Sequence, residues 1–189
     1  MTLQKSRIRA EDRRICRNLF LIAGNGRKSG KTTLACLLIR QFSSMPVAGI
    51  KISSHVHGKT PDSLKLIIRR ENYSVYEETD RSSAKDSSRM LAAGASRVFY
   101  INQGGEFAGE AFSEAAGMLD QGIPIVCESP SLIRDIEPGV FVIMINEDSS
   151  SPRDTEELKA YSHIRMTLDI LRRTDPLPFG FDGGRWITG

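Results

Sequence analysis

The sequence has few cysteines and no long hydrophobic run. Cys16, Cys36 and Cys127 are odd in number and lie far apart, without the spacing of a metal site or of a disulfide framework. We therefore expect a protein of the reducing cytoplasm. No apolar run approaches the roughly 20 residues that a membrane-spanning helix needs, and no apolar core follows the charged N-terminus. We expect neither a membrane partner nor a secretory signal.

The net charge of the chain is also small, and it is unevenly distributed along the sequence. The chain carries +3 over 189 residues, whereas residues 1–17 alone carry +4, so the remainder is close to neutral. A near-neutral body argues against a broad nucleic-acid surface, and we expect no nucleic-acid partner. We interpret 1–17 as a basic N-terminal arm, either a solvated tail or a capping helix, and 18–189 as a single domain.

One stretch carries the strongest functional signal. The apolar run 19–23 predicts a buried strand, a loop with three glycines follows, and Gly30-Lys31-Thr32 opens a helix, which is the context of a phosphate-binding P-loop. Lys31 is then expected to reach the β- and γ-phosphates as a catalytic residue, and Thr32 to hold Mg²⁺. The residues expected to bind the nucleotide are Gly24, Asn25, Gly26, Arg27, Lys28, Ser29, Gly30, Lys31, Thr32 and Thr33. Asn25 stands where the usual pattern has glycine, and a glycine-rich turn without a ligand is the alternative.

The rest of the chain alternates between strand and helix patterns. Runs rich in apolar residues at 47–52, 97–101, 123–127 and 140–145 predict strands, and 82–93, 106–121 and 132–136 predict helices. This alternation indicates a three-layer α/β domain of the P-loop NTPase class with a mostly parallel sheet. Residues 64–78 predict a β-hairpin extension, with a helix over 62–70 as the competing interpretation. The aromatic residues of the last fifteen positions suggest that this segment docks on another surface.

Two carboxylates are candidates for metal binding or catalysis beside the phosphates. Glu128 directly follows the strand 123–127, and an acidic residue at such a strand end supports the Mg²⁺ shell in P-loop proteins. Thr32 and Glu128 are therefore the predicted metal residues. Asp86 opens the helix 82–93, where it either favours the helix dipole or acts in catalysis by positioning metal or water. His55 and His57 have no evident third ligand, so zinc is not expected.

The motifs that read a guanine base are missing. No Asp-x-x-Gly occurs in the chain, and Asn146-Glu147-Asp148-Ser149 lacks the lysine and the final aspartate of Asn-Lys-x-Asp. The sequence motifs therefore leave GTP and ATP both open.

Four segments resemble the MobB-like molybdopterin-guanine dinucleotide biosynthesis proteins, a P-loop family. They are 24–34, Gly49-Ile50-Lys51 with the histidines after it, Lys85-Asp86-Ser87-Ser88-Arg89 with Ala92-Ala93-Gly94-Ala95, and Val126-Cys127-Glu128. Ser129 replaces the family's glycine, and the histidine cluster is reduced to His55 and His57. The resemblance implies GTP binding with Mg²⁺, slow hydrolysis, a homodimer, and an adaptor role with molybdopterin or a cofactor-biosynthesis enzyme as partner.

Together these features predict Mg²⁺-dependent binding of GTP or ATP with slow hydrolysis. A small-molecule kinase is the first alternative, with Arg69, Arg70 or Arg81 as lid residues, and a non-catalytic nucleotide-binding interaction module is the second. The hairpin is expected to mediate self-association through Tyr73, Val75 and Tyr76, because an excursion from the core leaves them little to pack against. The alternative is a hairpin that extends the domain's own sheet.

Overall fold

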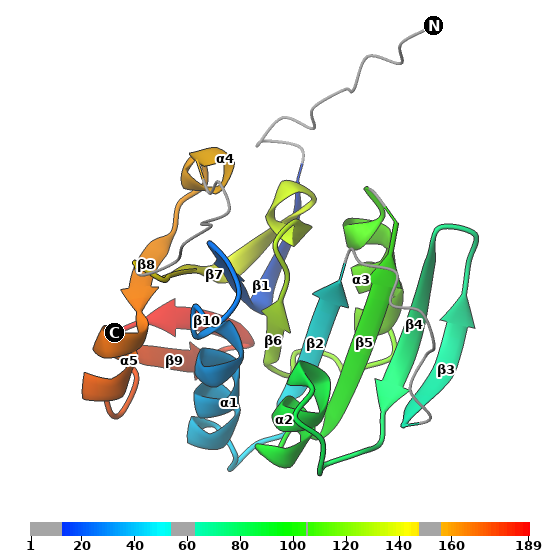
Figure 1. The fold of residues 1–189 in the computed structure, drawn as a ribbon, viewed down its shortest axis with the longest axis horizontal. Coiled ribbons are helices and arrows are strands. Elements are labelled where there is room, and N and C mark those ends of the chain that lie inside the picture. The colour runs from blue at the N-terminus through cyan, green and yellow to red at the C-terminus, as the bar shows by residue number, and fades with distance from the viewer. Residues whose placement is uncertain (1–12, 54–62, 105, 148–155) are drawn as a thin grey trace, which may run out of the picture.

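The chain folds around one eight-stranded sheet with helices on both faces (Figure 1). The computed structural model describes residues 13–53, 63–104, 106–147 and 156–189. The strand order is β3-β4-β5-β2-β6-β1-β7-β8. The six neighbouring strands β5, β2, β6, β1, β7 and β8 are parallel. β3 and β4 form an antiparallel hairpin, and β4 pairs antiparallel with β5. The strands are β1 (Arg14–Gly24), β2 (Ala48–Ser53), β3 (Leu64–Arg69), β4 (Tyr73–Glu78), β5 (Arg97–Gln103), β6 (Ile125–Glu128), β7 (Ile136–Ile145) and β8 (Ile164–Thr167).

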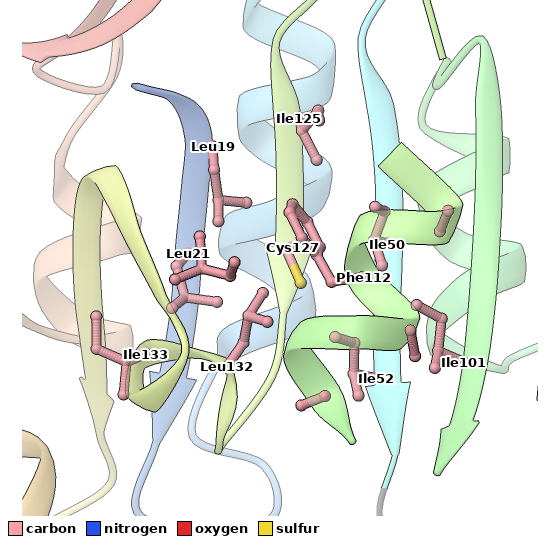
Figure 2. Close-up of a cluster of buried hydrophobic side chains, with 14 of the residues drawn as sticks. Leu19, Leu21, Ile50, Ile52, Ile101, Phe112, Ile125, Cys127, Leu132 and Ile133 are labelled. Atoms are coloured by element: carbon pink, nitrogen blue, oxygen red, sulfur yellow. The ribbon is translucent and has the colours of Figure 1, made fainter. Parts of the chain in front are cut away.

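Two apolar layers enclose the sheet and confirm the predicted α/β class. Along β1, Leu19 and Leu21 face one layer, where they pack with α3 (Ala108–Ala116) and the short 3₁₀ helix η2 (Leu132–Arg134) (Figure 2). Phe20 and Ile22 face the other layer, with α1 (Lys31–Gln41) and α2 (Asp86–Ala92). A strand buried on both faces reads as a continuous apolar run, which is why 19–23 shows no alternation.

The last segment of the chain packs on the α1 side of the sheet, as its aromatic residues suggested. It contains α5 (Leu168–Arg173) and a two-stranded ribbon of β9 (Phe179–Asp182) and β10 (Arg185–Thr188), whereas α4 (Glu156–Lys159), before it, adds Leu158 to the other layer. Trp186 is buried, its ring lies 5.2 Å from that of Phe20 and 5.0 Å from that of Phe42, and its indole N–H donates to the carbonyl of Asn18 (2.9 Å). The ribbon thus closes one side of the core around β1.

The hairpin β3–β4 confirms one prediction and corrects another. Its antiparallel pairing excludes the competing helix over 62–70. Because β4 also pairs with β5, Tyr73, Val75 and Tyr76 are buried within the chain itself. The expectation that these three side chains await a partner is therefore wrong. Leu66, on the outer strand β3, is the large apolar side chain that the hairpin exposes, at 41%.

Several element boundaries differ from the expected ones. β1 already begins at Arg14 and pairs with Ile136–Pro138, so 14–17 belongs to the sheet. The expected helix 132–136 is reduced to η2, since Ile136 opens β7; Pro138 is tolerated beside a register irregularity in β1. The helices expected at 82–93 and 106–121 are shorter, as α2 and α3. Within the described residues, no helix is long and apolar enough to cross a membrane.

Candidate functional site

A cavity of about 660 Å³ opens beside the C-terminal ends of β1, β2 and β6. Ligands of open parallel sheets bind at this edge, because the loops that follow the strands converge there. Nine of the ten residues predicted to bind the nucleotide line the cavity: Gly24, Gly26, Arg27, Lys28, Ser29, Gly30, Lys31, Thr32 and Thr33. The glycine-rich loop, residues 24–30, therefore forms one wall of a space large enough for a small-molecule ligand.

Asn25 is the exception among the predicted loop residues. It is buried, and its side chain forms two hydrogen bonds with the backbone of Asn146, which follows β7: its amide donates to the carbonyl (2.9 Å) and its oxygen accepts from the N–H (2.8 Å). Asn25 thus anchors the loop to the end of β7 and does not line the cavity. This explains how a polar side chain is accommodated at a position that usually holds glycine.

The two glycines that bracket the loop are required by its close packing. A Cβ on Gly24 would lie 2.7 Å from the Ser29 hydroxyl and 2.8 Å from the Met144 carbonyl. Gly30 has φ +94°, a left-handed conformation that favours glycine, and precedes the first residue of α1. The loop therefore turns tightly enough to place its backbone at the start of an eleven-residue helix, where N–H groups lack partners within the helix.

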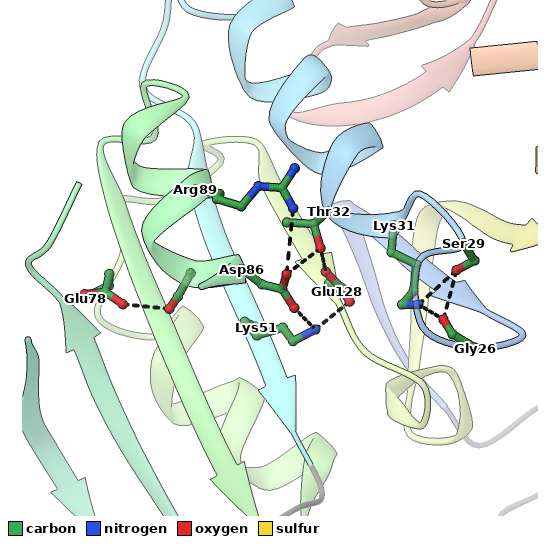
Figure 3. Close-up of polar contacts among 10 residues, drawn as sticks. Gly26, Ser29, Lys31, Thr32, Lys51, Glu78, Asp86, Arg89 and Glu128 are labelled. Carbon is green, nitrogen blue, oxygen red and sulfur yellow. Dashed lines mark hydrogen bonds and ion pairs between the residues drawn. The ribbon is translucent and has the colours of Figure 1, made fainter. Parts of the chain in front are cut away.

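Lys31 lies across this loop (Figure 3). Its ammonium donates to the Gly26 carbonyl (2.5 Å) and to the Ser29 hydroxyl (2.9 Å). A positive charge is thus held over the concave side of the loop, next to the positive end of the α1 dipole. This arrangement suits an anion with several oxygen atoms, such as a phosphate chain.

Thr32, Asp86 and Glu128 come together from α1, α2 and β6 (Figure 3). The Thr32 hydroxyl lies 2.8 Å from Glu128 Oε2 and 2.9 Å from Asp86 Oδ1. A hydroxyl has one hydrogen, so it can donate to only one carboxylate at a time. The Lys51 ammonium lies between the same carboxylates, 2.5 Å from Glu128 Oε1 and 2.9 Å from Asp86 Oδ2. Two carboxylates and one cation therefore lie in direct contact, with Glu128 buried and Asp86 partly exposed to the cavity.

The charges of this group are mutually stabilised. Burial by itself would lower the pKa of Lys51, but the attraction of Glu128 and Asp86 outweighs it and raises that pKa. Burial likewise opposes ionisation of Asp86, yet the nearby Lys51 and the Thr32 hydrogen bond lower the pKa of its carboxyl. Lys51 and Asp86 are consequently both charged at neutral pH.

The oxygen atoms of this group fit a hard divalent cation. Hydroxyl and carboxylate oxygens are ligands that Mg²⁺ accepts, and Mg²⁺ usually takes only one or two carboxylates from a protein and its other ligands from water and phosphate. In the described part of the chain, no cluster of three or more His, Cys, Asp or Glu residues could hold a metal alone. The donor set of Thr32, Asp86 and Glu128 is thus suited to a metal that arrives together with a phosphate ligand.

The structure brings some of the residues predicted from the sequence into the cavity and leaves others outside it. Lys31, Thr32, Asp86 and Glu128 all line the same cavity. The expected lid residues do not: Arg69 and Arg70 lie at the turn of the distant hairpin, where Arg70 pairs with Glu114 (2.6 Å). The third, Arg81, donates to the Leu91 carbonyl (2.5 Å). His55 and His57 fall outside the described residues.

The structure adds cavity residues that the sequence analysis gave no role. Lys51 interrupts an otherwise apolar strand, which is a usable signal for a functional charge. Arg89 of α2 lies 4.0 Å from Asp86, and Leu168 and Arg172 of α5 also line the cavity. These three carry no local signal, because long-range folding brings them to the loop.

Comparisons of the chain with protein-family models, with curated proteins and with solved structures found no match.

Proposed function

We propose that the cavity binds the triphosphate of a purine nucleotide, GTP or ATP, together with Mg²⁺, in the manner of a P-loop NTPase. One observation carries this proposal: Lys31 and Thr32, the first two residues of α1, contact two different parts of the cavity, the glycine-rich loop and the pair of carboxylates. Lys31 supplies a cation over the glycine-rich loop, and Thr32 meets Asp86 and Glu128 at an oxygen-rich corner. A magnesium triphosphate needs both features, a cradle for its phosphates and oxygens for its metal.

Each side chain then has a defined task. The loop backbone and Lys31 hold the β- and γ-phosphates and stabilise the charge that develops on them. Thr32 and Glu128, with Asp86 beside them, hold Mg²⁺, which neutralises phosphate charge when bound. Lys51 keeps the carboxylates paired and oriented before the ligand arrives.

Slow hydrolysis is expected from the same contacts. The cavity carboxylates of the described chain, Asp86 and Glu128, are both bound by Lys51, and the Thr32 hydroxyl donates to one of them at a time. Neither is set to orient or deprotonate an attacking water, so fast turnover requires a partner that completes the site.

We further propose the GTP preference, the homodimer and the adaptor role with molybdopterin or a cofactor-biosynthesis enzyme, all on the resemblance to MobB-like proteins.

A small-molecule kinase is the second candidate. Its expected lid residues are absent from the cavity, but Arg27, Arg89 and Arg172 line it and offer positive charge for a second anionic substrate. A product assay with γ-labelled GTP and ATP separates the two: free phosphate at a slow rate supports the NTPase, and labelled acceptor supports the kinase. Nucleotide binding without either product leaves the interaction module, and no binding of either nucleotide contradicts the proposal as a whole.

A further inference from the structure

We propose that Glu78 is a positioning residue for this cavity: it fixes the first turn of α2 so that Asp86 faces Thr32 and Lys51. The hold on α2 is a statement about the folded chain alone. Its consequence for metal binding rests on the proposed function.

Glu78 ends β4 as a buried carboxylate, 2% exposed. Its Oε1 accepts hydrogen bonds from the backbone N–H groups of Thr79 (3.1 Å) and Asp80 (3.0 Å). Its Oε2 accepts one from the hydroxyl of Ser87 (2.7 Å), which is itself buried (Figure 3). One side chain thus binds both the segment that leaves the sheet and the first turn of α2.

Apart from the contacts of Asp86 with Thr32 and Lys51, few polar contacts fix the first turn of α2. The helix has seven residues, too few to be stable without tertiary contacts, and Lys85 at its N-cap makes no side-chain capping bond. One further link comes from Ser88, whose hydroxyl accepts from the N–H of Ser83 (3.1 Å). The bond between Glu78 and Ser87 is therefore one of the few polar links that hold this turn, and it ties the turn to the end of β4.

Asp86 directly precedes Ser87, so a shift of Ser87 moves the carboxylate that meets Thr32 (2.9 Å) and Lys51 (2.9 Å). Hydrogen bonds weaken over a few tenths of an ångström, and metal ligands are equally sensitive to displacement. A residue that touches neither ligand nor metal can thereby set the geometry of the site.

The test compares Glu78→Ala, which removes all three bonds, with Glu78→Gln, which can keep them. The glutamine oxygen can accept from Thr79 and Asp80 while its amide donates to the Ser87 hydroxyl. Glu77→Ala is the matched control, because this neighbouring carboxylate pairs with Arg97 (2.8 Å) instead of with α2. Ser87→Ala is a milder variant that removes only the bond to α2, and it takes the place of Glu78→Ala if that protein does not fold.

The first readout needs no nucleotide. Hydrogen exchange of the Arg89 amide, which donates to the Lys85 carbonyl (2.9 Å), reports opening of the first turn of α2. The second readout is the Kd for Mn²⁺ with GTP, followed by EPR, against the Kd for GTP in EDTA. For Glu78→Ala we expect about tenfold faster exchange, about a tenfold higher Kd for Mn²⁺–GTP, and a metal-free Kd within twofold of wild type.

The conservative variant decides between geometry and charge. Glu78→Gln and Glu77→Ala are expected to match wild type in both readouts. If Glu78→Ala and Ser87→Ala leave exchange and Mn²⁺–GTP affinity unchanged, or if Glu78→Gln behaves like Glu78→Ala, the positioning role is overturned. If the wild-type protein binds no nucleotide while Arg89 exchange still responds to Glu78→Ala, the proposed function fails and the hold of Glu78 on α2 stands.

Discussion

Glu128 and Glu78 are both 2% exposed and both end a strand, yet different groups satisfy them. Glu128, at the centre of the sheet, is bound by the ammonium of Lys51 and the hydroxyl of Thr32. Glu78, near the outer edge, is bound by two backbone N–H groups and the hydroxyl of Ser87. The first carboxylate faces side chains that can move, and the second faces mostly backbone.

This difference separates a carboxylate that can bind a metal from one that organises the chain. A lysine side chain can withdraw and let a divalent cation take its place, whereas backbone amides at a strand end cannot withdraw without unfolding the turn. Burial of an acidic residue is therefore no guide to its role by itself. The mobility of the groups that neutralise it is the better guide.

The largest effect is expected from Lys31→Ala in the region around Glu128. In the proposed complex the substitution removes a charge beside the phosphates, so GTP affinity should fall at least about 100-fold, or about 2.7 kcal/mol, with little change for guanosine. Calorimetry measures both. The matched control is Lys65→Ala, an exposed lysine on β3. Unchanged GTP affinity in folded Lys31→Ala would remove the glycine-rich loop from the proposed site.

The same isosteric change at both glutamates tests the comparison itself. Glu128→Gln should raise the Kd for Mn²⁺–GTP about 10- to 100-fold, because the amide is a poor metal ligand, while the fold persists through the remaining Lys51–Asp86 pair. Glu78→Gln should change this Kd less than about twofold. EPR titration of both variants gives the answer, and equal effects would abolish the distinction between the two carboxylates.

The hairpin of β3 and β4 should tolerate substitution only on its outer strand, β3. Val75→Ala removes buried methyl groups and should lower the free energy of unfolding by about 2 kcal/mol. Leu66→Lys should cost less than about 0.5 kcal/mol and, if the hairpin mediates self-association, should convert the dimer to a monomer. Urea unfolding and light scattering measure these effects. A wild-type protein that is monomeric at high concentration, with or without GTP, contradicts the dimer.

The smallest effect concerns pH. Burial opposes the charge of Asp86, but Lys51 prevails and lowers the pKa of its carboxyl in the folded state. Its charge therefore stabilises the protein above the ordinary pKa of about 4, and this contribution is lost as the pH falls through the lowered value. The stability difference between wild type and Asp86→Asn should be constant from about pH 5 to 8 and shrink below about pH 4. Urea unfolding across this range checks it, with a change at an exposed carboxylate, Asp120→Asn, as the control.

The sequence was informative where local pattern decides structure. The apolar run 19–23, the glycines and Lys31-Thr32 predicted a strand, loop and helix in the right order, and Glu128 was placed at its strand end. Together with the alternating elements, these features were enough for the α/β class. The position of Asp86 at the start of a helix was also right, although its meeting with Thr32 and Lys51 was not predictable.

What remained hidden depends on contacts between distant segments. The burial of Tyr73 and Val75 follows from the pairing of β4 with β5, which was the alternative in the sequence analysis and which hairpin propensity alone does not select. Glu78 ends the predicted hairpin within the polar run Glu77-Glu78-Thr79-Asp80, where no local pattern distinguishes it from an exposed carboxylate. Asn25 looked like a ligand residue because of its place in the motif, and only the end of β7 explains its burial.

The most direct measurement is a calorimetric titration of the wild-type protein with GTP and with ATP, in Mg²⁺ and again in EDTA. We predict saturable binding of at least one of these nucleotides at one site per chain, weakened at least tenfold when the metal is removed. We also predict competition by the corresponding nucleoside diphosphate and none by the nucleoside at equal concentration. Absence of binding in Mg²⁺, or affinity that is the same in EDTA, would contradict the assignment of Lys31, Thr32 and Glu128 to a magnesium triphosphate site.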